Sequence, residues 1–278
     1  MTRLITTIAE MRDIRASLTG RVGLVPTMGS LHDGHLTLMR RAREQSDVLI
    51  VSDFVNPLQF GPNEDYDRYP RDLDGDLAKV DGLADYLFAP SAEEMYPAEE
   101  PFQVDVGRIG TVFEGAMRPG HFNGVATVVL KLFIIIRPDI AVFGQKDAQQ
   151  LAVIRRLVRD FNVPVDIIPA PISREGSGLA RSSRNAYLDE DGRWHALALS
   201  GLLKDLSGRR MPAPELLHAL EQARATSSTD VQWDYAEAVD PATFEPIDSS
   251  FTGDAVVIVA ARVQGVRLLD NAEITVGT

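Results

Sequence analysis

Short apolar runs alternate along the chain with longer segments in which apolar residues recur every three or four positions. Short apolar runs are typical of buried strands, and the longer period is typical of amphipathic helices. The apolar runs predict strands at residues 22–25, 48–55, 84–89, 140–143 and 163–168. The longer period predicts helices at residues 7–18, 36–44, 73–80, 125–136 and 148–161. Strand and helix therefore alternate through this part of the chain.

This alternation predicts an α/β fold, in which a Rossmann-like parallel sheet has helices on both faces. After Ile168 the order changes, because two helical patterns precede two strand-like runs, at residues 190–206, 214–226, 233–239 and 255–263. We therefore expect a larger Rossmann-like domain over residues 1–172 and a smaller α+β C-terminal domain over residues 173–278. Two connecting segments are interpreted as a solvated acidic loop, 61–76, and a short strand, 103–106.

The stretch from Val22 to Leu38, which reads VGLVPTMGSLHDGHLTL, has the features of a phosphate-binding site. Its apolar run is expected to stop at Pro26 and to lead through a glycine-bearing loop into a helix. Free backbone N–H groups and the helix dipole favour an anion at such a helix N-terminus. His32 and His35 add imidazole donors, and Gly34 keeps the backbone accessible to a phosphate. Ligands of parallel α/β sheets bind at this end of a strand.

Two histidines three residues apart are also typical of a metal site. Zinc takes three or four protein ligands, and the chain has no cysteine to supply them. The remaining ligands would come from carboxylates or from His121, His195 or His218. This stretch alone therefore leaves three interpretations open: a metal hydrolase, a nucleotide-binding protein, and a pair of surface histidines with no role in binding.

Composition argues against several classes of protein. The 278 residues carry a formal net charge of −12, and a nucleic-acid partner would need a basic surface. The apolar runs are all far too short to span a membrane, and we expect no secretory signal at the start of the chain. Without cysteine there are no disulfides and no thiolate catalysis, in agreement with a cytoplasmic location.

Three further clusters follow predicted strands or lie in a polar loop, namely FVNPLQF at 54–60, FGQKDAQQ at 143–150 and GLARSSRN at 178–185. Together with PTMGSLHDGH at 26–35 and RPGHFNGVATVVLKL at 118–132, they closely resemble the pantoate–β-alanine ligase (pantothenate synthetase) family. That family belongs to the nucleotidylyltransferase superfamily marked by His-x-Gly-His, here His32-Asp33-Gly34-His35. The resemblance extends over residues 1–190 and is weaker beyond them.

The resemblance implies a ligase that forms a C–N bond in coenzyme A precursor biosynthesis. Pantoate and ATP would give a pantoyl adenylate and pyrophosphate, and the amine of β-alanine would then displace AMP. Mg2+ would be bound mainly through the phosphates rather than in a protein metal site. The family precedent also implies a cytoplasmic homodimer that acts on small molecules, with neither nucleic acid nor membrane as a partner.

The same resemblance implies a role for individual residues. Those implied in ATP binding are Met28, Gly29, Ser30, Leu31, His32, Asp33, Gly34, His35, Gly144, Gln145, Lys146, Asp147, Ser173, Arg181, Ser182, Ser183 and Arg184. The catalytic residues among them are His32, His35, Lys146, Ser182, Ser183 and Arg184, and Asp147 is expected to accept from the ribose hydroxyls. A helix N-terminus biases His35 towards the neutral, hydrogen-bond-donating form. Gln59 and Gln150 are implied in substrate binding, mainly to pantoate.

The chain departs from the family pattern at three positions of the polar loop. Ser177 stands where an aspartate is common, Ser173 where a valine is common, and Arg181 where an apolar residue is usual. These departures leave the closure of this loop and the reaction rate open. Another nucleotidylyltransferase of the superfamily and a non-catalytic nucleotide-binding homologue are the alternatives.

Overall fold

A computed structural model of the chain describes residues 1–62, 64, 66–226 and 228–277, which form two units. The first unit contains Met1–Gly144 and Val153–Ala170, and the second contains Gln145–Ala152 and Pro171–Thr278. The division expected from the sequence, at residue 172, stays a prediction. Nothing in the sequence indicated that the short segment Gln145–Ala152 groups with the C-terminal part of the chain.

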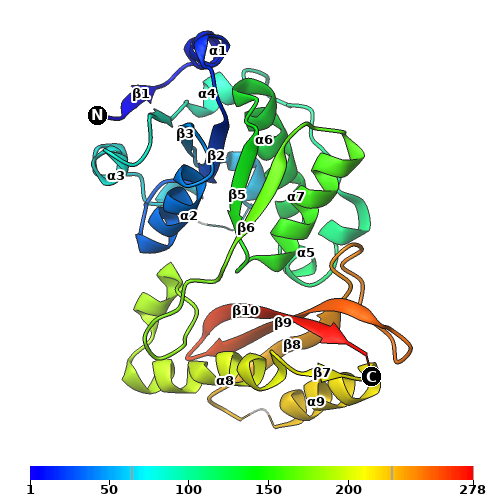
Figure 1. Ribbon diagram of the computed structural model, residues 1–278. Coiled ribbons are helices and arrows are strands. Elements are labelled where there is room, and N and C mark those ends of the chain that lie inside the picture. The colour runs from blue at the N-terminus through cyan, green and yellow to red at the C-terminus, as the bar shows by residue number, and fades with distance from the viewer. Residues whose placement is uncertain (63, 65, 227, 278) are drawn as a thin grey trace. The chain divides into compact units, whose positions relative to one another are not determined.

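A parallel sheet of six strands lies at the centre of the first unit (Figure 1). Its order is β1-β4-β3-β2-β5-β6, and every neighbouring pair is parallel. The strands are β1 (Arg3–Ile5), β2 (Val22–Thr27), β3 (Val48–Asp53), β4 (Tyr86–Phe88), β5 (Ile140–Gly144) and β6 (Asp166–Ala170). The α-helices up to β6 are α1 (Ile8–Ser17), α2 (Asp33–Arg43), α3 (Leu73–Val80), α4 (Ala92–Met95), α5 (Glu114–Met117), α6 (His121–Ile136) and α7 (Ala148–Asp160). Short 3-10 segments are η1 (Pro57–Gln59), η2 (Tyr66–Arg68) and η3 (Gly107–Gly110). The α/β class predicted from the alternation is confirmed.

Both faces of this sheet are buried. Successive strand residues point to opposite faces, and Val25, Val51, Leu87 and Val142 pack in one cluster with residues of α2 and α3. Their neighbours Leu24, Ile50, Phe88 and Ala141 are fully buried as well. The sheet is therefore covered on both sides, and its strand ends and connecting loops are where polar chemistry can reach a ligand.

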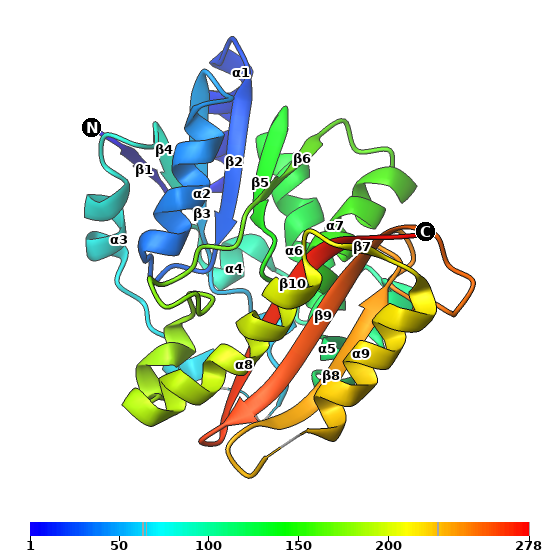
Figure 2. The same ribbon diagram turned by 60° about the horizontal axis from the view of Figure 1, so that its bottom comes forward.

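The second unit contains a mixed sheet in the order β7-β10-β9-β8. Its strands are β7 (Arg210–Met211), β8 (Gln232–Val239), β9 (Gly253–Val263) and β10 (Val266–Val276), and its helices are η4 (Ser183–Tyr187), α8 (Glu190–Leu206) and α9 (Ala213–Ala225). Figures 1 and 2 both show α8 and α9 on the same face of this sheet. Leu203 of α8, Leu216 of α9 and Val257 of β9 share one apolar core. The smaller α+β region predicted from the sequence is confirmed as a mixed sheet with helices.

Two local predictions are wrong for reasons of hydrogen bonding. Strand β2 continues through Pro26, which pairs with Ser52 of β3. On its other side β2 pairs with β5 only at residues 23 and 24, so the missing N–H of proline breaks no bond to β5. Residues 103–106 form no strand. The N–H groups of Val104 and Val106 donate instead to side chains of α6.

Two further features were not foreseen. The acidic segment 61–76, interpreted as a solvated loop, ends in Asp76, which is fully buried. Strand β10 was missed, although its Leu268, Ile274 and Val276 lie in the core of the second unit. Polar residues in the middle of the strand, Asp270 and Asn271, hide its alternation.

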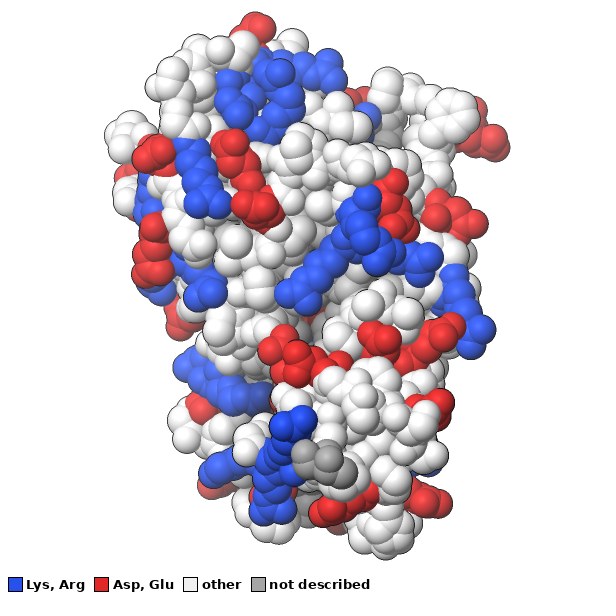
Figure 3. Space-filling view, turned by 45° about the vertical axis from the view of Figure 1, so that its right-hand side comes forward, with Lys and Arg blue, Asp and Glu red and all other residues white. Residues whose placement is uncertain are grey.

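Charged side chains of both signs are interspersed on the face drawn in Figure 3. Several arginines of the protein form ion pairs with carboxylates, for example Arg193–Glu175, Arg224–Glu237 and Arg43–Asp85. Within the described ranges, no helix is long and apolar enough to cross a membrane.

The contact between α6 and η1 depends on a glycine. A Cβ at Gly124 would lie 2.2 Å from the carbonyl oxygen of Leu58, which is backbone and cannot swing aside. We expect Gly124→Ala to lower the free energy of unfolding by about 1–3 kcal/mol, the usual range for overpacking. Gly201 of α8 is the control, because nothing lies within 4 Å of its Cβ position and alanine there should stabilise the helix by up to about 1 kcal/mol. Denaturant unfolding of both variants measures the difference, and equal effects would contradict the close contact.

Candidate active site

The loop between β2 and α2 presents two imidazoles in a defined tautomer. His32 caps α2, and its Nδ1 accepts a hydrogen bond from the Gly34 N–H at 3.1 Å. The Nδ1 of His35 accepts from the His32 N–H at 3.4 Å, and the two rings stack with centroids 4.0 Å apart. Because each Nδ1 is an acceptor, a neutral ring carries its proton on Nε2. Both histidines are therefore hydrogen-bond donors through Nε2.

The electrostatic surroundings keep His35 neutral. Burial, followed by repulsion from His32, lowers the pKa of His35 to about 4, although Asp76 acts in the opposite direction. The helix N-terminus was the cause suggested by the sequence, whereas desolvation is the main cause in the structure. At neutral pH His35 donates a proton in a hydrogen bond without carrying a positive charge.

The backbone of this loop takes a left-handed conformation at Gly29 and Ser30, with φ values of 76° and 51°. A Cβ at Gly29 would lie 2.4 Å from Oδ1 of Asp53. At Gly34 it would lie 2.8 Å from the ring of His32. Gly34 thus makes room for an imidazole, a second reason for glycine besides the access of a phosphate to the backbone.

Two carboxylates that the sequence analysis missed lie beside this loop. Oδ1 of the buried Asp76 accepts from the Leu31 N–H at 2.8 Å and from the Lys79 ammonium at 3.1 Å. Its Oδ2 is buried and has no hydrogen-bond partner among the described residues. Asp53 ends β3, and burial followed by repulsion from Asp76 raises its pKa to about 6. In the sequence, the only hint of a role for Asp76 is that Lys79 follows it three residues later in a predicted helix, at a spacing that allows an ion pair.

Gln59 is 7% exposed, and both ends of its amide have partners. Its Oε1 accepts from Nδ2 of Asn56 at 3.1 Å, and its Nε2 donates to Sδ of Met28 at 2.9 Å. Asn56 is itself fixed, because Nδ2 donates to the Gly124 carbonyl and Oδ1 accepts from the Tyr96 hydroxyl. A thioether is a weak acceptor, so the Nε2 donor of Gln59 is the group most easily transferred to a ligand. Asn56 belongs to the FVNPLQF cluster, but nothing in the sequence marks it as the residue that orients Gln59.

His121 supports the same segment. Its Nε2 lies 3.0 Å from Nη1 of Arg118, which can only donate, so Nδ1 carries the proton and donates to the Gln59 carbonyl at 2.9 Å. Arg118 in turn pairs with Glu64 through two bonds of 2.7 and 2.6 Å, and this hydrogen bonding lowers the pKa of Glu64. Both ring nitrogens of His121 are thus engaged by protein groups. Within the described residues, no group of three or more His, Asp or Glu side chains is arranged to hold a metal ion.

The second unit brings three of the predicted phosphate-binding residues together. Lys146, Ser182 and Arg184 line one pocket, with Arg267 and Asp270 on its wall. Oγ of Ser182 accepts from the Arg184 N–H at 3.3 Å and caps η4. The side chain of Ser183 lies outside the described part of the structure.

The strand-to-helix turn that carries Lys146 is ordered by its own cap. Oδ1 of Asp147, expected to accept from a ribose, accepts from the Gln150 N–H at 3.0 Å. Gln150 is half-buried in the first turn of α7, next to the buried Gln149. The structure therefore gives Asp147 a helix-capping role in addition to the expected one.

The departures in the polar loop are accommodated locally. The N–H of Arg181 donates to the Ser173 carbonyl at 2.8 Å, and its Nε donates to the Arg174 carbonyl at 3.2 Å. Ser177 accepts from the Leu179 N–H at 3.5 Å. The cation at position 181 is therefore held against its own loop.

Comparison with known protein families gives one match over nearly the whole chain. The profile of the family described as pantoate-beta-alanine ligase matches residues 3–273. The chain belongs to the pantoate–β-alanine ligase family. The resemblance noted in the sequence is confirmed, and the chain is a ligase that forms a C–N bond.

Individual members of this family match the chain over nearly their full lengths. The pantothenate synthetase of Acidothermus cellulolyticus is 52% identical over 271 residues, which are 95% of this chain and 89% of that protein. The crystal structure of pantothenate synthetase from Thermus thermophilus matches with a TM-score of 0.86 and 47% identity, covering 99% of this chain and 100% of that one. The pantoate-beta-alanine ligase of Francisella tularensis, solved with beta-gamma ATP and beta-alanine, matches with a TM-score of 0.77 and 34% identity over 98% and 97% of the two chains.

The raised pKa of Asp53 predicts a pH-dependent cost in stability. A carboxyl whose pKa is 3.8 when unfolded and about 6 when folded stabilises the fold fully below pH 4 and loses this contribution as the pH rises through 6. We expect Asp53→Asn to be more stable than the parent at pH 7 by about 1–2 kcal/mol, allowing for partial solvent screening, and equally stable near pH 4.

Asp81→Asn provides a control of opposite sign. The hydrogen bond from the Thr2 N–H lowers the pKa of Asp81, so this variant should be destabilised at pH 7 relative to pH 4. Urea unfolding at several pH values measures both. A parent and an Asp53→Asn protein with parallel pH profiles would contradict the assignment.

Proposed function

We propose that this chain condenses pantoate with β-alanine at the expense of ATP, releasing AMP and pyrophosphate. Membership of the pantoate–β-alanine ligase family supports the overall reaction. The two imidazoles at the N-terminus of α2, of which His35 is kept neutral by burial, support the first step through a pantoyl adenylate. Their tautomer, set by backbone hydrogen bonds to both Nδ1 atoms, is the observation that carries the mechanism.

In the first step the carboxylate of pantoate attacks the α-phosphorus of ATP, and the bond to the bridging oxygen of pyrophosphate breaks. A carboxylate is already ionised at neutral pH, so the step needs no general base. The site must align the reactants and stabilise the charge that moves onto pyrophosphate. His35 and Lys146 are the proposed donors to this transition state, and His32 stacks on His35.

The residues proposed to bind ATP come from both units of the chain. Residues 28–35 and Gly144 belong to the first, whereas residues 145–147, Ser173 and the loop residues 181–184 belong to the second. Ser182 and Arg184, with Ser183, are proposed to hold the phosphates, and Asp147 the ribose.

A magnesium ion is proposed to accompany ATP, held mainly by the phosphates. The buried Oδ2 of Asp76, which lacks a partner among the described residues, and the nearby carboxylate of Asp53 are hard oxygen donors of the kind that Mg2+ prefers. When bound, the ion would offset negative charge on the phosphates. Binding it would also favour ionised Asp53.

Gln59 and Gln150 are proposed to bind pantoate through neutral amides, which leave its carboxylate reactive. In the second step the amine of β-alanine attacks the acyl carbon of the adenylate, the bond to AMP breaks, and the amine loses a proton. By family precedent we further propose a cytoplasmic homodimer, with no nucleic-acid or membrane partner.

The first half-reaction gives a direct test of the function. We expect labelled pyrophosphate to exchange into ATP when pantoate is present and β-alanine is absent, because adenylate formation is complete in itself. With all three substrates the nucleotide product should be AMP. Chromatography of the nucleotides measures both, and ADP as the product would show attack at the γ-phosphorus and rule out an adenylate.

Gln59→Glu should separate pantoate recognition from ATP binding. The variant keeps the shape of the side chain and an acceptor for Asn56, but replaces the Nε2 donor with negative charge close to an anionic substrate. We expect pantoate affinity to fall by a few kcal/mol, about a hundredfold or more, with ATP affinity changed much less. Isothermal titration with each ligand measures this, and Gln45→Glu, where the amide nitrogen donates to the Arg41 carbonyl at the end of α2, is the control. Equal losses for both ligands would remove Gln59 from the pantoate site.

A further inference from the structure

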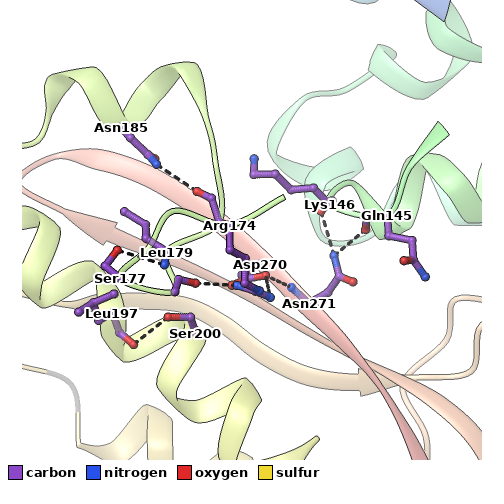
Figure 4. A network of polar contacts seen from close by, with 12 residues as sticks. Gln145, Lys146, Arg174, Ser177, Leu179, Asn185, Leu197, Ser200, Asp270 and Asn271 are labelled. Atoms are coloured by element: carbon purple, nitrogen blue, oxygen red, sulfur yellow. Dashed lines mark hydrogen bonds and ion pairs between the residues drawn. The ribbon is translucent and has the colours of Figure 1, made fainter. Parts of the chain in front are cut away.

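Two adjacent polar residues of β10 each hold one of the loops that line the cationic pocket of the second unit (Figure 4). Asp270 and Asn271 are only 4% and 7% exposed. Successive strand residues point to opposite faces, so the two side chains leave the strand in different directions. Along this stretch β10 pairs with β9 on one side, whereas its pairing with β7 is confined to residues 275 and 276.

Asn271 holds the turn that carries Lys146. Its Nδ2 donates to the carbonyl oxygens of Gln145 at 2.8 Å and of Lys146 at 2.9 Å. Both hydrogens of the amide are therefore used on consecutive peptide units. Glu273, two residues further along the same face, accepts from Nε2 of Gln145 at 3.0 Å. The backbone of Lys146 is fixed from outside its own strand and helix.

Asp270 holds the other loop. Its two carboxylate oxygens accept from Nη1 and Nη2 of Arg174 at 2.7 and 3.0 Å, a bidentate pair. Nη1 of Arg174 also donates to the Gly178 carbonyl, and the Arg174 carbonyl accepts from Nε of Arg181. The backbone of Arg174 forms an isolated antiparallel β-bridge with Ala180 across the loop. The segment that leads into Ser182 and Arg184 is thus tied to Asp270.

The carboxylate and the amide are also bound to each other. Oδ1 of Asp270 accepts from the Asn271 N–H at 2.9 Å. The turn with Lys146 and the loop with Ser182 and Arg184 are therefore both anchored to one short piece of backbone, and the pocket they line has Asp270 in its wall.

We propose that Asp270 and Asn271 are positioning residues for adenylate formation, with Asn271 acting through Lys146 and Asp270 acting through the loop that carries Ser182 and Arg184. The role rests on the function proposed above. In this proposal neither residue contacts a substrate directly. Their contribution is to hold donors from two chain segments at a fixed spacing, and a displacement of about 1 Å in such a site costs on the order of a hundredfold in rate.

Asn271→Asp tests this proposal with little change in shape. It removes both N–H donors and places a negative charge near two carbonyl oxygens. We expect single-turnover formation of pantoyl adenylate at saturating ATP to slow by about 10–100-fold, with a much smaller change in the KM for pantoate. Thr275→Val on the same strand, where Oγ1 donates to the exposed Asp254, is the matched control and should keep the parental rate.

A double-mutant cycle with Lys146→Ala distinguishes positioning from a general structural effect. If Asn271 acts through Lys146, adding Asn271→Asp to Lys146→Ala should cause no further slowing. Losses that multiply, or an Asn271→Asp enzyme within about threefold of the parental rate, would overturn the proposal. Asn271→Ala, which removes the amide without adding charge, serves in the same cycle if the aspartate variant folds poorly.

Hydrogen exchange gives a readout that does not depend on turnover. Asn271→Asp should speed amide exchange in residues 145–152, and Asp270→Asn should speed it in residues 174–182, each with little effect on the other segment. Exchange unchanged in both segments would overturn the proposal. A parent chain that forms no adenylate would overturn the proposed function instead, while the exchange data would still show whether β10 holds the two loops.

Discussion

The site must attract a polyanion although the chain as a whole is strongly acidic, and this constraint accounts for much of its construction. With a net charge of −12, the protein cannot rely on its overall field. In the first unit the groups proposed to meet the phosphates carry no full charge, namely backbone N–H groups of the β2–α2 loop and the imidazole of His35, whose pKa burial lowers. Desolvation is what keeps His35 uncharged, so the same burial that removes water also selects the form that donates a hydrogen bond.

The tautomer of the histidines depends on the way α2 begins. A helix N-terminus has N–H groups without intrahelical partners, and His32 and His35 use their Nδ1 atoms to accept from the amides of Gly34 and His32. The way the helix begins and the tautomer of both rings are thereby linked. The Nδ1 acceptors complete the N-terminus of the helix, so Nε2 is the donor nitrogen of each neutral ring. This arrangement explains the need for two histidines three residues apart better than either a phosphate site or a metal pair does alone.

The sequence predicted those features that local periodicity and short motifs determine. It did not predict the residues whose role depends on tertiary contacts. The alternation of strands and helices predicted the parallel sheet, and the loop motifs indicated the family. Periodicity did not reveal β10, because Asp270 and Asn271 replace apolar residues in the middle of the strand to hold two loops. Asp76 was hidden in a segment whose composition is that of a solvated loop, and tertiary contacts such as the hydrogen bond from the Leu31 N–H place it beside the β2–α2 loop. Residues that act on other residues, such as Asn56 on Gln59, leave no local signal.

The close approach of α6 to η1 at Gly124 has a consequence for how this protein can vary. Asn56 is held by the Gly124 carbonyl, and the Gly124 Cβ position is filled by the Leu58 carbonyl. The Gln59 amide is thus positioned through Asn56 by a main-chain carbonyl of α6, and the side chain of His121 at the start of the same helix holds the Gln59 carbonyl. Apart from His121, a changed side chain on α6 leaves the carbonyl that holds Asn56 in place, as long as the helix still packs against η1. The absence of a side chain at Gly124 lets η1 come close enough to α6 for this main-chain link to the Gln59 amide.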